Sequence, residues 1–229
     1  MRVILFGATG MVGQGVLREC LLDAGVAKVL SVGRSRLKEI DPKIEEIVQK
    51  NLFDLSNTET RLSGYDACFF TLGVSSAGMT EADYTHLTYD LTLSIAATLA
   101  RINPDMTFIY VSGAGTDSAG NGRMMWARVK GRAENDLLRL PFKAAYMFRP
   151  GVIQPLHGIT SRTGWYRLVY SILAPLTPML RAFPKYVTTT EQVGRAMLAV
   201  ARRGYPTRIL ESADINAVDV APTLSGKSR

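Results

Sequence analysis

The sequence has few residues of the kinds that cross-link a fold or bind metals. It contains two cysteines and two histidines among 229 residues, and Cys20 and Cys68 lack the spacing of a disulfide framework or a metal site. No run of about 18 apolar residues occurs, so no membrane-spanning helix is expected. Glycine interrupts the opening MRVILFGATG too early for a signal peptide. These absences predict a reduced, cytoplasmic protein.

Acidic residues are scarce in the later part of the chain. Residues 121–208 carry 15 Lys and Arg but 3 Asp and Glu, whereas residues 1–120 carry 10 and 14. A basic, acid-poor surface suits an anionic ligand, or a membrane contact that is peripheral at most. No nucleic-acid motif and no aromatic–basic stripe accompanies the charge, so we expect no nucleic acid as partner.

Short apolar runs alternate with helical patterns along the chain. We predict strands at residues 3–6, 29–32, 44–48, 67–71, 107–111, 145–148 and 209–210, and helices at 11–22, 83–100, 123–140 and 190–203. Apolar strands separated by helices are typical of a parallel sheet covered on both faces. The sequence therefore predicts an α/β protein with a doubly wound parallel sheet, a Rossmann fold, in which ligands bind at the carboxyl ends of the strands.

A glycine-rich turn, GATGMVG, joins the first strand to the first helix. Gly7 suits a tight turn, Gly10 a close approach of the backbone to a diphosphate, and Gly13 close packing of helix on strand. The helix N-terminus offers free N–H groups and a positive dipole end to phosphates. We therefore expect a dinucleotide to bind at Gly7, Thr9, Gly10, Met11, Val12 and Gly13.

The end of the second strand indicates which dinucleotide binds. An NAD site places Asp or Glu there, but this chain has Gly33-Arg34-Ser35-Arg36. Because a guanidinium forks onto a phosphate, Arg34, with Ser35 second, favours NADP(H) over NAD(H). Asp54, after the third strand, is positioned either to meet the adenine amino group or to cap the next helix.

These motifs, together with YVSGAG at the fifth strand, resemble the short-chain dehydrogenase/reductase superfamily. The likeness is greatest to its atypical branch, with the NAD(P)-binding epimerase/dehydratase-like members and the Tat-interacting oxidoreductase-like proteins. It extends from Met1 to about Ile215. The resemblance implies that Thr71-Leu72-Gly73 and Pro150, in Arg149-Pro150-Gly151, contact the cofactor.

The resemblance also implies a catalytic set. Ser112 matches the family's substrate-positioning Ser, and Lys130, followed by Glu134, matches the Lys that holds the ribose and tunes a catalytic Tyr. Trp126 stands at that tyrosine's position, four residues before Lys130 and on the same helix face. An indole N–H donates a hydrogen bond but does not ionise near neutral pH, so the usual acid–base step is weakened.

Two functions remain open from the sequence. One is an NADP-dependent oxidoreductase or epimerase-like enzyme acting on a small substrate, with Tyr84 or a water supplying the proton. The other is a non-catalytic NADPH sensor or scaffold that regulates a partner.

The domain organisation follows from the same patterns. We predict a single dinucleotide-binding domain over residues 1–215 and a flexible tail over 216–229. Within the domain, residues 152–188 form a small substrate-side segment. The apolar residues 165–180 in it suit a lid over a pocket, packing against the core, or contact with a second copy in a homodimer.

Overall fold

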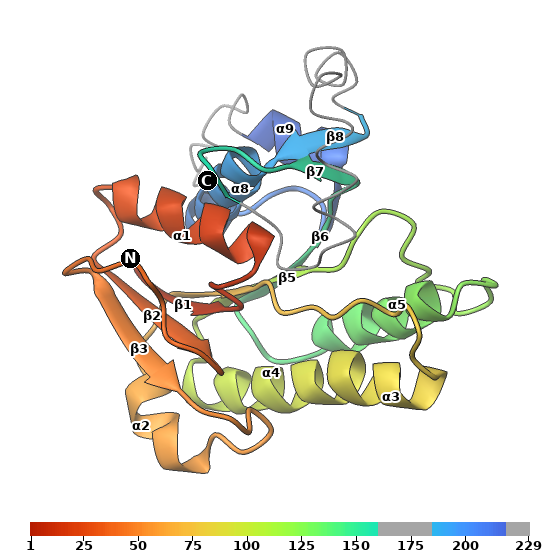
Figure 1. Ribbon diagram of the computed structural model, residues 1–229, viewed down its shortest axis with the longest axis horizontal. Helices are drawn as coiled ribbons and strands as arrows, with labels where there is room; N and C mark the ends of the chain where they lie inside the picture. Colours follow the sequence, from red (N-terminus) through yellow and green to blue (C-terminus); the bar gives the residue numbers. More distant parts are fainter. Residues whose placement is uncertain (160–184, 219–229) are drawn as a thin grey trace, which may run out of the picture.

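A single parallel sheet forms the centre of the computed structural model, which describes residues 1–159 and 185–218 (Figure 1). Seven of the described strands pair in the order β3-β2-β1-β4-β5-β6-β9, and each pair is parallel. They are β1 (Arg2–Phe6), β2 (Lys28–Gly33), β3 (Ile44–Val48), β4 (Ala67–Phe70), β5 (Thr107–Val111), β6 (Ala144–Arg149) and β9 (Ile209–Glu211). The predicted doubly wound Rossmann sheet is confirmed, with strand ends within two residues of those expected.

Helices cover both faces of this sheet. Figure 1 shows α1 (Met11–Leu22) and α8 (Thr190–Arg203) on one face, with α4 (Leu91–Ile102) and α5 (Met125–Leu137) on the other. The short η1 (Ser56–Thr58) and α2 (Glu59–Leu62) lie beside α4. The β1 side chains alternate between the two resulting cores, with Val3 and Leu5 in one and Ile4 and Phe6 in the other.

The predicted helix over residues 83–100 contains an unexpected wide turn. The helical path runs from α3 (Glu81–Thr85) through the π-helical turn η2 (His86–Asp90) into α4. Because a π turn holds an extra residue, it rotates the helix face by about one position. Thr88 is therefore buried, while Leu87, the expected first member of the apolar stripe, is 40% exposed. Ile95 and Leu99, beyond the turn, are buried as predicted.

A second, two-stranded sheet lies beyond the carboxyl end of β6. It pairs β7 (Val152–Gln154) with β8 (Val187–Thr189), and the sequence did not predict either strand. The sequence also did not predict α9 (Ser212–Ala217), which runs across the expected domain end at 215. The apolar residues 165–180 and most of the predicted tail lie outside the described residues.

The described helices are all too short or too polar to cross a membrane. Within residues 1–159 and 185–218, no group of His, Cys, Asp or Glu is arranged to hold a metal ion. Cys20 and Cys68 are both buried and free.

Candidate functional site

The three glycines of the glycine-rich turn between β1 and α1 lie in three different surroundings. Gly7 has a φ of +85°, and a β-carbon there would lie 2.8 Å from the Thr71 backbone. A β-carbon at Gly13 would lie 2.0 Å from the Gly7 carbonyl oxygen, so α1 packs against the turn at backbone distance. At Gly10 a β-carbon would approach only that oxygen, at 3.3 Å. Gly10 is therefore the least crowded of the three glycines.

The N-terminus of α1 points its free amides out of this turn. Gly10 is the N-cap residue in an extended conformation, and no described side chain caps it. The turn is closed by the Gly10 N–H, which donates to the Gly7 carbonyl at 2.9 Å. The first intrahelical bond runs from the Gln14 N–H to the Gly10 carbonyl, so the amides of Met11, Val12 and Gly13 have no partner within the helix. This end of α1 is built to receive an anion.

The end of β4 lies against the same turn. Thr71 donates from its N–H and its hydroxyl to the Phe6 carbonyl, at 3.0 and 2.7 Å. Leu72 follows, partly exposed, and a β-carbon at Gly73 would meet nothing within 4 Å. The structure thus brings the predicted Thr71-Leu72-Gly73 turn to the glycine-rich turn.

The loop after β2 presents a cation to solvent. Arg34 and Ser35 are exposed, and Arg34 forms no hydrogen bond or ion pair with any described residue. Asp54 is also exposed and accepts from the N–H and the hydroxyl of Ser56, at 3.0 and 2.7 Å. These bonds hold the pKa of Asp54 below its usual value and fix the turn that leads into η1. Asp54 does not cap the next helix as the sequence allowed, because the N-cap residue of η1 is Leu55 and no described side chain caps it.

The sequence-predicted Ser112 and Lys130 meet at the end of β5. The Lys130 ammonium donates to the Ser112 carbonyl oxygen, and Lys130 is partly exposed. The Ser112 hydroxyl is 6% exposed and lies 2.5 Å from a Glu134 oxygen, with the Phe148 carbonyl at 3.2 Å. Both neighbours are acceptors, so the hydroxyl hydrogen points into the protein.

Glu134 is completely buried and is balanced by Arg149. The guanidinium of Arg149, at the end of β6, donates to both carboxylate oxygens. It also bonds Ser118 at 2.5 Å, and its side chain is 12% exposed. The sequence placed Glu134 and Arg149 in motifs but did not predict this pair. The signal available was the acid-poor stretch 121–208, in which Glu134 is one of three acids.

Trp126 lies one turn before Lys130 on α5, as the spacing predicted. Its ring is near Gly115, where a β-carbon would lie 3.6 Å from the indole Cη2. Trp126 is partly exposed, and its N–H donates to no described residue. Tyr84, the alternative proton donor, is 2% exposed within α3. The structure therefore places Trp126, and not Tyr84, where it can meet a ligand.

Pro150 closes the site on the β6 side. The Ala114 N–H donates to the Pro150 carbonyl at 2.9 Å, which continues the β5–β6 ladder beyond the strands. At Gly151 the N–H donates to the Ser212 hydroxyl, and a β-carbon would lie 2.5 Å from the Tyr186 carbonyl oxygen. The chain from Pro150 into β7 is thus held in place beside Ser112.

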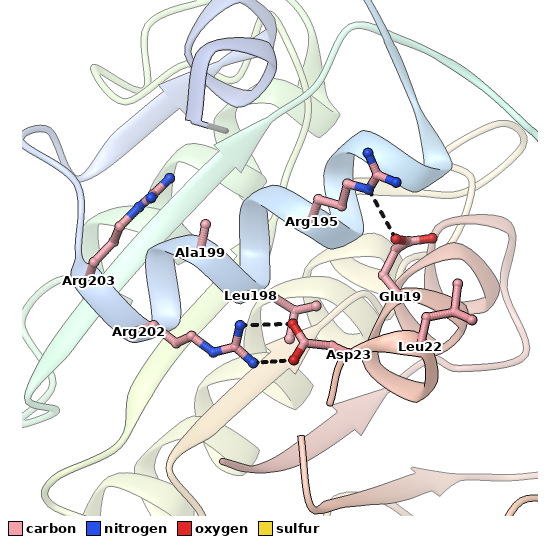
Figure 2. A pocket seen from close by; sticks show the side chains of 8 residues that line it. All are labelled: Glu19, Leu22, Asp23, Arg195, Leu198, Ala199, Arg202 and Arg203. Atoms are coloured by element: carbon pink, nitrogen blue, oxygen red, sulfur yellow. Dashed lines mark hydrogen bonds and ion pairs between the residues drawn. The ribbon is translucent and has the colours of Figure 1, made fainter. Parts of the chain in front are cut away.

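A hollow of about 370 Å³ lies elsewhere, between the far end of α1 and α8 (Figure 2). Two ion pairs bridge it: Arg202 binds Asp23 through two bonds of 2.8 and 2.6 Å, and Arg195 lies 3.3 Å from Glu19. Both carboxylates are thus paired with arginines, while Arg203, also in the lining, donates to the Val218 carbonyl. This hollow is remote from the glycine-rich turn, which is at the opposite end of α1.

No protein-family model matches the chain. Among curated proteins it is similar to "Protein FMP52, mitochondrial" of Eremothecium gossypii, at 29% identity over 94% of this chain and 96% of that protein. It is similar to the protein of that name from Meyerozyma guilliermondii at 25% identity, over 88% and 85% of the two chains. These names contradict the expectation of a cytoplasmic protein.

Solved structures share the fold. WbmF of Bordetella bronchiseptica, in complex with NAD+, superposes with a TM-score of 0.66 at 16% identity, over 96% of this chain and 77% of that one. UDP-glucose 4-epimerase of Thermotoga maritima gives 0.64 at 16% identity, over 92% and 76%. The chain therefore has the same Rossmann fold as these two proteins. A relation to the Tat-interacting proteins is not among these similarities.

Proposed function

We propose that this chain binds a nicotinamide dinucleotide, NADP(H) in preference to NAD(H), and acts as an atypical short-chain dehydrogenase-type oxidoreductase or epimerase on a small substrate. The observation that carries the proposal is the uncapped N-terminus of α1 directly after a turn that needs glycine at 7 and 13. Its amides and dipole favour a diphosphate. WbmF, a protein of this fold, was crystallised with NAD+.

The residues around the turn fit the rest of such a cofactor. The open Gly10 leaves room for the diphosphate to approach the backbone, and Thr9, Met11 and Val12 line the same turn. The exposed Asp54 lies in the loop after β3, from which it would face the adenine.

The NADP(H) preference rests on Arg34. Its guanidinium is exposed and has no partner among the described residues, so a 2′-phosphate would be its first one. Ser35 adds a hydroxyl beside it, and no acid stands in the stretch Gly33-Arg34-Ser35-Arg36 to hold a ribose 2′-OH instead.

The nicotinamide half would lie between the β4 and β6 ends. Thr71, Leu72 and Gly73 border it on one side and Pro150 on the other, with Lys130 in reach of a ribose. When bound, the nicotinamide supplies or accepts a hydride. The chain's own part is to hold the substrate oxygen near Lys130 and Trp126 and to exclude water.

A second function, an NADPH sensor without turnover, is favoured by two features. The resemblance implies that Trp126 stands in place of the tyrosine acid, and the Ser112 hydroxyl donates to Glu134 rather than toward a ligand. Turnover of NADPH with any member of a carbonyl panel supports the enzyme. Tight binding without turnover, together with altered affinity for a partner, supports the sensor.

Titration with NADPH and NADH tests the cofactor proposal. We expect the native chain to bind NADPH more tightly than NADH. Arg34→Ala should lower the affinity for NADPH by about 10- to 100-fold, which is what a charge-assisted hydrogen bond contributes, and change the affinity for NADH little. Lys38→Ala, in the same loop, is the charge-matched control, since Lys38 is equally exposed. Equal affinity of the native chain for both cofactors would overturn the Arg34 assignment.

A further inference from the structure

The polar groups beside the expected catalytic position differ in what they have to offer a substrate. Ser112 is buried, and both neighbours of its hydroxyl are acceptors. Trp126 has an N–H but does not ionise near neutral pH. Tyr84 and Tyr110 are 2% and 1% exposed, and burial raises the pKa of Tyr110 far above its usual value. Three of these four are buried, and the fourth, Trp126, does not ionise near neutral pH.

Lys130 differs from all of them. Its Nζ donates to a single described acceptor, the Ser112 carbonyl, and the residue is partly exposed. An ammonium has three N–H bonds, so two remain for water or a ligand. Because Lys130 and Trp126 are four residues apart on α5, both face the same side of the helix.

The charges around Lys130 leave it without a carboxylate of its own. Glu134, one turn further along α5, is the acid that acts on it, but both oxygens of Glu134 bind Arg149. Arg149 is in turn close to Glu211, at 3.5 Å. Burial outweighs the attraction of Glu134 and lowers the pKa of Lys130 to about 8. A lysine in this condition is mostly protonated at pH 7 and releases its proton readily.

We propose that Lys130 itself exchanges a proton with the substrate oxygen, in place of the residue that stands at position 126. This rests on the proposed function, because it assigns a step of that reaction. In the reductive direction the carbonyl carbon accepts a hydride, with its electron pair, from the reduced nicotinamide. The C–O π pair moves to the oxygen, one N–H bond of the Lys130 ammonium breaks, and the proton passes to that oxygen. The neutral amine then regains a proton from water.

The first experiment needs neither cofactor nor substrate. Competitive acetylation of the native chain by acetic anhydride from pH 6 to 11, read by mass spectrometry, gives the titration midpoint of each lysine. Lys143 is the internal control because it is exposed at the start of β6. We expect a midpoint near 8 for Lys130, below that of the exposed control lysine. A Lys130 midpoint equal to that of Lys143 would overturn the proposal.

The second experiment separates proton transfer from cofactor binding. Lys130→Arg keeps the positive charge, but the guanidinium stays protonated at pH values far above neutral. Lys130→Gln removes the charge and keeps an N–H donor for the Ser112 carbonyl. We expect both variants to bind NADPH within about tenfold of the native chain and to lose carbonyl reduction by about 100-fold or more. Lys143→Arg is the matched control and should change neither quantity.

The outcomes distinguish this assignment from the function on which it rests. If the native chain fails to bind NADPH, the proposed function is wrong, whatever the lysine midpoints are. If the native chain reduces a carbonyl and Lys130→Arg does so within threefold, the function stands and the assignment to Lys130 is overturned. If Tyr84→Phe loses carbonyl reduction while Lys130→Arg stays active, Tyr84 and not Lys130 supplies the proton.

Discussion

The carboxylate of Glu134 and the guanidinium of Arg149 form an ion pair beneath the candidate site, in which Glu134 is completely buried and Arg149 nearly so. Glu134 also accepts from Ser112, whose carbonyl in turn holds Lys130. The pair thus supports both residues at the end of β5. Removing Arg149 would leave the Glu134 carboxylate buried without a cation, and removing Glu134 would leave Arg149 with Glu211 alone.

Glu134→Gln should therefore lower the free energy of unfolding by about 3 kcal/mol, since Arg149 loses its buried partner and keeps only the more exposed Glu211, 3.5 Å away. Urea denaturation, followed by circular dichroism, measures this. Glu59→Gln is the control, because Glu59 pairs with the exposed Arg101 at the surface and should cost below about 1 kcal/mol. Similar small losses in both variants would show that the buried pair contributes no more than a surface pair.

Gly13→Ala should abolish the phosphate-binding geometry. Its β-carbon would lie 2.0 Å from the Gly7 carbonyl oxygen, so α1 must move away from the turn. We expect NADPH affinity to fall by more than about tenfold and stability to fall by about 1–3 kcal/mol, the usual cost of overpacking. Gly33→Ala is the stability control, since a β-carbon there would meet only the Ser35 carbonyl oxygen at 4.0 Å. An unchanged NADPH titration in Gly13→Ala would contradict the proposed site.

Trp126→Tyr should add a second acid whose effect depends on pH. Lys130, with a pKa of about 8, loses its proton as pH rises through that value, whereas a phenol keeps its proton to about 10. The ratio of variant to native carbonyl reduction should therefore increase between pH 7 and 9.5, measured by NADPH oxidation. Met125→Tyr places the same phenol about 100° around α5 and is the control. A ratio that is constant across this range would argue against Lys130 as the native acid.

The sheet followed from the sequence because its central strands β1, β4, β5 and β6 are nearly continuous apolar runs, whose burial on both faces leaves little choice of structure. The β7–β8 pair did not, since three-residue strands carry no period that a sequence pattern can register. The π turn was missed for a related reason. The spacing of Leu87, Leu91 and Ile95 assumes 3.6 residues per turn throughout, and one extra residue moved Leu87 into solvent.

The site was predicted unevenly. The glycine-rich turn is local, so adjacent residues specify its geometry, and the roles of Gly7 and Gly13 were readable in advance. The link from Lys130 through Ser112 to Glu134 and Arg149 joins three elements, β5, α5 and β6, and its hydrogen bonds depend on how these elements pack. The direction of the Ser112 hydroxyl is decided by a carboxylate 22 residues away, which motif position alone does not reveal.

The packing of α1 on α8 has a consequence for how the protein is made. A β-carbon at Gly15 would lie 2.6 Å from the Thr190 carbonyl oxygen, and one at Gly194 would lie 2.8 Å from the Glu19 side chain, so the two helices touch almost backbone to backbone. Helix α1, whose N-terminus presents the free amides, thus has its apolar face covered by residues from the last fifth of the chain. During synthesis, α1 would therefore become rigid only after α8 (Thr190–Arg203) has left the ribosome and packed against it.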